Sequence, residues 1–194
     1  ARQKEELRAE ILDAARELFF AEGYDNFSMR KLAERIEYSP TTIYLYFKDK
    51  AELFNSLCEE TFAKLAHKLE TLRRRHETDP LGFFRAGARA YIEFGLKHPH
   101  HYTVTFLQSP KGTGDYHSEG SFGERAFNHL RGAVEWCVAE KIFRSVDLDA
   151  TAQSMWGTLH GVTALLIVHR DFPFVPKSRL IEQTIDLMVS GLRR

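Results

Sequence analysis

Apolar residues recur every three or four positions along almost the whole chain, a spacing that predicts amphipathic helices. The first stretch carries Leu7, Ile11 and Leu18 on one face and is expected to end at Gly23. Neither the strict alternation of a strand nor an Asn-Gly hairpin turn occurs in the sequence. The hydrophobic pattern therefore predicts an all-α fold.

Cap residues mark where the next three helices begin. Ser28 precedes a short helix, and Ser39-Pro40 places proline at the first position of a second short helix. Asp49 and Glu52 form a capping box that opens a long third element. The region from Ser28 onward is thus predicted to hold two short helices followed by a long one.

The second half of the chain is predicted to continue as helices. Asp79-Pro80, Ser121 with Glu124, and either Asp147 or Asp149 are the start signals, and Pro99 is a stop signal. The expected helices cover about residues 80–98, 122–140, 148–169 and 178–194, with a short apolar segment at 101–107. Residues 108–121 are rich in glycine, serine and charge and are read as a loop. The total is about nine helices.

The composition of the chain argues against several classes of protein. The 194 residues include 27 Lys and Arg against 27 Asp and Glu, so the net charge is zero and bulk coating of nucleic acid is excluded. Two cysteines, Cys58 and Cys137, are too few for a disulfide framework or a structural zinc site, and we expect no metal and no cofactor. Six of the first ten residues are charged, and no apolar stretch approaches the ~20 residues of a membrane span. We expect a cytoplasmic protein without membrane contact.

The segment from Ser28 to Leu53 carries the strongest functional signal. Two short helices with a tight connection follow a longer one, which is the pattern of a helix-turn-helix unit. The apolar residues expected to pack together in it are Leu32, Ile36, Ile43 and Phe47. Such a unit leaves the outer face of its second short helix free for the DNA major groove. The alternative is a helix pair that serves only as a packing unit.

The expected outer face is rich in hydroxyl groups and cations. Hydroxyl and lysine side chains suit phosphates, and threonine can also meet a base edge or a thymine methyl. Arg2 and Lys4 are expected on an N-terminal arm. The candidate DNA contacts are Arg30, Ser39, Pro40, Thr41, Thr42, Tyr44, Tyr46, Lys48 and Lys50.

The same segment resembles the tetracycline-repressor (TetR) family. The string SPTTIYLYFKDKAEL at 39–53 is similar to the family's Tyr-x-x-Phe signature with a downstream lysine. The strings SMRKLAERI at 28–36 and ILDAARELFFAEGYDNFS at 11–28 are similar to its second and first helices. The resemblance implies a homodimeric repressor that binds a palindromic DNA operator through residues 1–48. It also implies that residues 49–194 bind a ligand and dimerise.

The family pattern assigns roles to individual residues. By resemblance, Tyr44 stands at the phosphate-contacting tyrosine, Tyr46 at an aromatic position near the DNA backbone, and Lys50 at the lysine that begins the next helix. Thr41 and Thr42 stand at positions close to the bases, and Arg30 of the preceding helix stands where some members read a base. One departure is Glu37-Tyr38, where the family usually has glycine and valine. Either this turn is strained, at roughly 1–2 kcal/mol for a left-handed residue, or it takes another conformation.

The C-terminal part is expected to enclose a largely apolar ligand pocket. The strings WGTLHG at 156–161 and YIEFGLKHPHHYTVTF at 91–106 resemble one subgroup of the family. Aromatic residues with a few polar groups are typical of small-molecule sites, and no cluster of Lys or Arg accompanies them. The effector is therefore expected to be small and apolar or aromatic. The candidate ligand contacts are Phe84, Tyr91, Tyr102, Phe106, Phe127, Trp136, Trp156, His160 and Thr163. A fully packed aromatic core is the alternative.

The last two helices are expected to form the dimer interface. Their apolar faces are wide, and a two-fold contact between helix pairs would bury them as a four-helix bundle. The candidate interface residues are Val162, Leu166, Ile181, Ile185, Met188 and Leu192. Two rival functions are an enzyme on a helical scaffold, for which no catalytic set stands out, and an interaction module that has lost DNA binding. We therefore predict a ligand-released repressor and not an enzyme.

Overall fold

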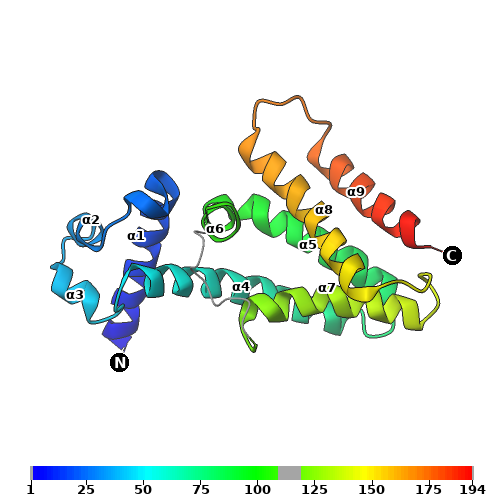
Figure 1. The fold of residues 1–194 in the computed structure, drawn as a ribbon, viewed down its shortest axis with the longest axis horizontal. Coiled ribbons are helices and arrows are strands. Elements are labelled where there is room, and N and C mark those ends of the chain that lie inside the picture. Colours follow the sequence, from blue (N-terminus) through cyan, green and yellow to red (C-terminus); the bar gives the residue numbers. More distant parts are fainter. Residues whose placement is uncertain (1, 109–118, 194) are drawn as a thin grey trace. The chain divides into compact units, whose positions relative to one another are not determined.

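The computed structural model describes residues 2–108 and 119–193. Within these residues the chain forms nine α-helices and a π-helical turn, with a single β-bridge between Phe143 and Arg193, which confirms the all-α prediction (Figure 1). The helices are α1 (Arg2–Asn26), α2 (Met29–Arg35), α3 (Pro40–Tyr44), α4 (Lys50–Arg75), α5 (Pro80–Lys97), α6 (Pro99–Tyr102), the π-helical turn η1 (Thr103–Leu107), α7 (Phe122–Ala139), α8 (Leu148–Val168) and α9 (Lys177–Leu192).

Side-chain caps begin the helices where the sequence predicted them. Each cap accepts a hydrogen bond from the backbone N–H three residues later, at 2.8–3.2 Å, and so satisfies a free donor of the first turn. These residues are Ser28, Ser39, Asp49, Asp79 and Asp147. Of the two candidates for α8, Asp147 is thus the cap, while Asp149 accepts from Arg131 at 2.6 Å.

Two local expectations need correction. The prediction of an N-terminal arm is wrong, because α1 already begins at Arg2 and includes Lys4. Gly23 leaves helical geometry as expected, with φ of 76°, but three further helical residues follow it. The short apolar segment expected at 101–107 forms the end of α6 and η1, in agreement with the predicted total of about nine helices. Of the loop predicted at 108–121, residues 109–118 lie outside the described part of the chain.

The chain divides into two compact units. The first unit comprises residues 1–62 and 99–121, and the second unit comprises residues 63–98 and 122–194. Helix α4 contributes its N-terminal half to the first unit and its C-terminal half to the second. These units are defined by packing, so a functional boundary after residue 48 stays a prediction.

An aromatic cluster forms the core of the first unit. Phe19 stacks on Phe27 with ring centroids 3.9 Å apart and meets Phe54 edge-on at 5.2 Å. These rings come from α1, the α1–α2 connection and α4, so they hold the three segments together. Of the four residues expected to pack between the short helices, Leu32, Ile43 and Phe47 are buried and Ile36 is half-buried.

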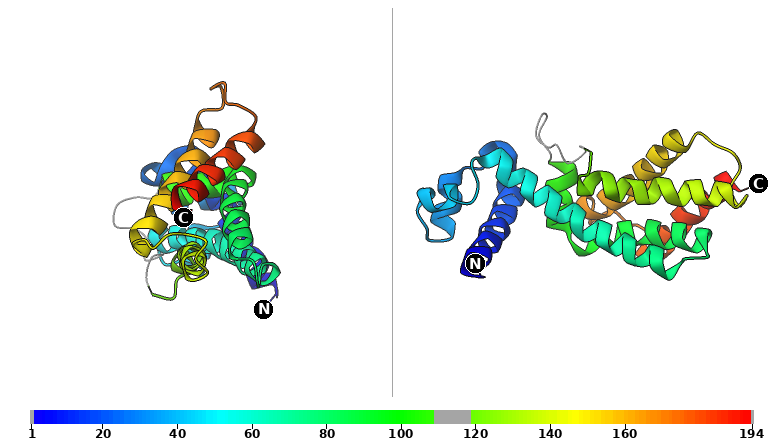
Figure 2. Two further views of the ribbon diagram at one scale, coloured as in Figure 1. Left: turned by 90° about the vertical axis from the view of Figure 1, so that its right-hand side faces the viewer. Right: turned by 90° about the horizontal axis from the view of Figure 1, so that it is seen from below.

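The second unit is built around α5, α7 and α8, which pack against one another, with α9 on α5 and α8 (Figures 1 and 2). Phe84 of α5 meets Phe143 edge-on at 5.4 Å inside this core. Ala88 and Ala133 are also buried, which lets the helix backbones approach closely. Hydrophobic burial across these helices is the main source of the unit's stability.

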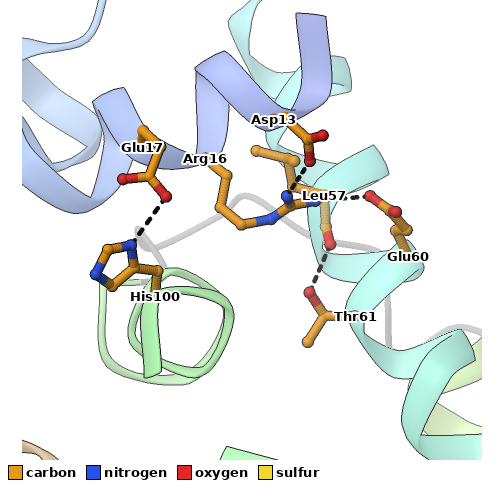
Figure 3. Close-up of polar contacts among 7 residues, drawn as sticks. All are labelled: Asp13, Arg16, Glu17, Leu57, Glu60, Thr61 and His100. Carbon is orange, nitrogen blue, oxygen red and sulfur yellow. Dashed lines mark hydrogen bonds and ion pairs between the residues drawn. The ribbon is translucent and has the colours of Figure 1, made fainter. Parts of the chain in front are cut away.

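A buried arginine joins α1 to α4 within the first unit (Figure 3). Arg16 is only 5% exposed, and its guanidinium donates to Asp13 at 2.5 Å and to Glu60 at 2.7 Å. Among the described residues, none accepts a hydrogen bond from its Nε. Because an uncompensated buried charge is costly, the position of α1 on α4 depends on Glu60.

A second link joins α1 to α6 (Figure 3). The Nδ1 atom of His100 lies 2.9 Å from Glu17, and its ring stacks on Phe20 at 3.8 Å between centroids. Gln108, just after η1, lies 3.5 Å from the carbonyl oxygen of Phe20, toward which its amide points. Helix α1 is therefore held by both α4 and α6.

For the turn between α2 and α3 the sequence left open a strained conformation or a different one. The structure has the strained conformation. Glu37 has φ of 60°, in the left-handed region that favours glycine. The Tyr38 N–H donates to the Ala33 carbonyl at 3.0 Å, and the Glu37 N–H to the Glu34 carbonyl at 3.4 Å. These are the two bonds of a Schellman ending, so the turn keeps the geometry a glycine would give.

The strain at Glu37 predicts a stabilising substitution. Glu37→Gly should raise the free energy of unfolding by about 1 kcal/mol, because the relief of left-handed strain exceeds the entropy that glycine loses on folding. Chemical denaturation of both proteins measures this difference. Glu37→Ala is the control, since it removes the carboxylate but keeps Cβ, and it should leave stability nearly unchanged. A less stable glycine variant would contradict the strain argument.

The buried charge at Arg16 predicts strong coupling with Glu60. Glu60→Ala should cost about 2 kcal/mol in the otherwise unchanged protein, because it leaves the Arg16 guanidinium under-compensated. In an Arg16→Met background the same change should cost less than about 0.5 kcal/mol, since no buried cation remains. Denaturation of the four proteins gives the coupling energy. Equal losses in both backgrounds would show that Arg16 does not depend on Glu60.

Candidate functional site

Helix α3 buries one face within the first unit and exposes the opposite face to solvent. Ile43 and Phe47 are buried, whereas Thr41 and Tyr44 are exposed, Tyr44 to 52%. Ser39 caps the helix, and Pro40 occupies its first turn, so the direction of this short element is fixed at its start. The result is a rigid, hydroxyl-bearing face.

The two threonines of α3 differ in availability. Thr41 is exposed. Thr42 is half-buried, and its Oγ1 lies 2.9 Å from Oγ of Ser39, with which it shares a hydrogen bond. Thr41 is thus free to meet a partner directly, while Thr42 must give up this bond first.

Basic side chains follow α3 and flank it on α2. Lys48 is exposed, and Lys50 places its ammonium 4.1 Å from the ring centroid of Tyr24. Burial lowers the pKa of Lys50, against an opposing effect of Asp25. Arg30 on α2 is exposed and pairs with Glu34 at 2.9 Å, a surface pair that a stronger anion can displace.

Helix α1 adds two further cations that belong to this surface. The Lys4 ammonium lies 5.9 Å from the Tyr46 ring centroid, and the Arg8 guanidinium 5.1 Å from that of Phe47. Arg8 was not predicted as a DNA contact, because a charged residue on the polar face of a helix usually contacts only solvent. The four-residue spacing of Lys4 and Arg8, which places both on one face of α1, was the available signal.

Hydroxyls and cations together make a surface suited to a polyanion. Phosphates of a duplex accept hydrogen bonds from Tyr44 and Thr41 and attract the surrounding lysine and arginine side chains. An α-helix of this kind fits the width of the major groove of B-DNA. The local concentration of cations matters here because the net charge of the chain is zero.

The structure brings together four of the nine candidate ligand residues, all in the second unit. Trp156 Nε1 donates to Tyr91 Oη at 3.1 Å, and Tyr91 Oη lies 3.4 Å from His160 Nδ1. Phe127 meets the Trp156 ring edge-on at 6.2 Å. Burial lowers the pKa of His160, which favours the neutral imidazole. These four residues are called the Tyr91–Trp156 cluster below.

The other five candidates lie elsewhere. Phe84 packs on Phe143, Trp136 stacks under the Arg73 guanidinium at 3.9 Å, and the Thr163 hydroxyl donates to its own helix. Tyr102 and Phe106 pack on each other in the first unit, with centroids 4.7 Å apart.

A separate groove of about 360 Å³ lies between α4, α5 and α9 of the second unit. None of the nine candidate ligand residues lines it. Its walls are Lys68, Leu72, Gly82, Arg85, Ala86, Arg89, Ala90, Glu93, Glu182 and Ile185.

Most residues expected at a dimer interface are buried within the chain itself. Val162 is half-buried, and the other five are buried, namely Leu166, Ile181, Ile185, Met188 and Leu192. The large apolar side chains that α8 and α9 leave exposed are Leu165, Val168 and Leu187, at 47%, 59% and 64%. Packing inside one chain therefore explains the wide apolar faces that the sequence displayed.

The cysteines are buried in the two units. Burial raises the pKa of Cys58 to about 12 and that of Cys137 to about 11. Both thiols are therefore protonated at neutral pH and unsuited to nucleophilic attack. Among the helices described, none combines the length and apolar character needed to cross a bilayer.

Comparison with known proteins extends over most of the chain. Residues 11–57 match the model of the bacterial regulatory proteins of the tetR family, and residues 84–192 match the tetracyclin repressor-like C-terminal domain. The HTH-type transcriptional regulator TtgR of Pseudomonas putida is 30% identical over 83 residues, which are 43% of this chain and 40% of TtgR. The matched part thus spans less than half of that relative.

Solved structures share the fold over nearly the full chain. A protein of unknown function from Rhodococcus sp. RHA1 has a TM-score of 0.80 at 24% identity, covering 97% of this chain and 96% of that one. The regulator PfmR of Thermus thermophilus has a TM-score of 0.75 at 23% identity, covering 95% and 96%. At these identities the likeness concerns the fold. The C-terminal family model alone covers more than half of the sequence. The chain belongs to the tetR family of bacterial regulatory proteins.

Proposed function

We propose that the protein is a transcriptional repressor that binds a palindromic operator as a homodimer and is released by a small apolar or aromatic ligand. The observation that carries the proposal is the outer face of α3, where Thr41 and Tyr44 are exposed beside basic side chains of α1, α2 and α4. Such a face serves both readout of bases and contact with phosphates. A repressor acts at its operator, so the proposal places the protein in the cytoplasm.

The dimer is proposed to form through α8 and α9. Leu165, Val168 and Leu187 are large apolar side chains that these helices leave in solvent, and Val162 is half-buried beside them. A two-fold contact would cover them, and an exposed apolar patch is a common mark of a protein interface. Two copies would also present two α3 helices, one for each half of a palindrome.

The ligand is proposed to bind at the Tyr91–Trp156 cluster. Its aromatic rings come from α5, α7 and α8, and its polar atoms are neutral, which suits a neutral or weakly polar molecule. A ligand acts as an effector only if it binds one conformation of the dimer better than another. Helix α4 supplies residues to both units and is the natural route for that effect.

The DNA proposal predicts distinct effects for phosphate and base contacts. Tyr44→Phe should weaken binding about tenfold on operator and unrelated DNA alike, because it removes one hydrogen bond to phosphate in each half-site. Thr41→Ala and Arg30→Ala should instead change which sequences are preferred. Gel-shift titration with promoter DNA neighbouring the gene measures both effects, and the mass of the complex should correspond to two chains.

Salt dependence supplies the control for this experiment. Lys50→Ala should reduce the slope of log affinity against log salt by about 1 per chain, whereas Lys68→Ala on the same helix should not change it. If Tyr44→Phe and Lys50→Ala both retain the affinity and slope of the unchanged protein, the contact model is wrong. If the unchanged protein binds no DNA, the interaction-module alternative is favoured.

The ligand proposal predicts a specific loss of apolar binding. The neutral fluorescent probe N-phenyl-1-naphthylamine should bind the protein and release it from DNA, and Trp156→Ala should weaken the probe's binding about tenfold. Trp136→Ala removes the same ring from its place on Arg73 and should leave probe affinity unchanged. If Trp156→Ala lowers only stability while probe affinity and DNA release persist, the cluster is a packed core and the ligand site lies elsewhere.

A further inference from the structure

Exposed large apolar side chains gather in two places in the described part of the chain. Five of them belong to α8, α9 and the connection between these helices, where the dimer contact is proposed. The other three, Tyr38, Tyr44 and Leu45, lie within eight residues at and beside α3. Leu45 is 73% exposed, more than any other member of this set. Apolar side chains gathered in this way indicate a contact surface, unlike single exposed leucines.

Backbone geometry places Leu45 on the outer face of α3. The Leu45 residue has helical φ and ψ, and the helical turn continues beyond it, since the Phe47 N–H donates to the Ile43 carbonyl at 3.1 Å. Thr41, Tyr44 and Leu45 are spaced as i, i+3 and i+4, which puts them on one side of the helix. Ile43 and Phe47 occupy the buried side.

The chemistry of Leu45 limits what it can recognise on DNA. Its side chain has no hydrogen-bond donor or acceptor, so it can contact neither a phosphate nor a base edge through polar atoms. The major groove offers one apolar group, the C5-methyl of thymine. By resemblance, the neighbours Thr42, Tyr44 and Tyr46 have expected roles at the DNA, whereas Leu45 has none, because a leucine in a helix is expected in a core.

We propose that Leu45 determines operator specificity by packing against the C5-methyl group of a thymine in each half-site. The inference rests on the proposed function, since it requires that α3 enters the major groove. Binding removes both the leucine side chain and the methyl group from water, and each buried methyl is worth roughly a fourfold change in affinity. Tyr44 and Thr41 on the same face hold the helix close to the DNA.

Replacement of thymine by deoxyuridine tests this contact, because it removes only the methyl group. Each thymine of an operator bound by the unchanged protein is replaced in turn, in both half-sites together. At one position the affinity should fall roughly 15-fold, the product of two fourfold losses. Leu45→Ala should bind the thymine operator with a similar loss and should no longer distinguish thymine from deoxyuridine at that position. Leu45→Met, which stays apolar and long, should retain the distinction.

Controls separate this inference from the proposed function. Leu187→Ala removes an equally exposed leucine from α9 and should keep the full sensitivity to deoxyuridine. If the unchanged protein binds an operator but no replacement weakens it, or if Leu45→Ala keeps the sensitivity, the role of Leu45 is overturned while DNA binding stands. If the unchanged protein binds no DNA, the proposed function fails and the inference fails with it.

Discussion

The buried guanidinium of Arg16 fixes the position of α1 on α4 in the first unit. A cation at 5% exposure is tolerable only where anions lie within hydrogen-bond distance, and here one comes from α1 itself and the other from α4. The same helix is held by α6 through the Glu17–His100 pair and the stacked Phe20 ring. Helix α2 packs on both α1 and α3, so the orientation of the two short helices follows from the position of α1. Figure 3 shows the links that fix α1.

This arrangement connects packing to function. A small shift of α4 moves Glu60, and α1 must follow or leave the buried charge of Arg16 uncompensated. A buried ion pair of this kind fixes position more strictly than an apolar contact, which can slide. The position of α1 in turn sets the position of the outer face of α3 and of the cations beside it. A protein with zero net charge obtains affinity for a polyanion only by such local placement.

Much of the fold was predictable because its signals are local. Five caps begin helices where the sequence placed them. At Glu37 the sequence left two conformations open, and the structure has the left-handed one. The Arg16–Glu60 pair joins residues 44 positions apart, and nothing in the helical pattern reveals it. Ile181, Ile185 and Met188 look the same in sequence whether their own chain or a partner covers them; the structure buries them internally. Leu45 was not predicted as a contact residue, because the spacing of apolar residues cannot show that a leucine is exposed.

In the proposed complex, α3 of two copies reads a two-fold symmetric DNA site. Selection of binding sequences from a random DNA pool by the full chain is the decisive experiment. We expect enrichment of one inverted repeat whose half-sites lie in successive major grooves, about 10 base pairs apart or a multiple of that spacing. Loss of the enrichment with Tyr44→Phe would place α3 at the DNA. Recovery of no motif, or of a motif unaffected by changes on α3, would contradict the account.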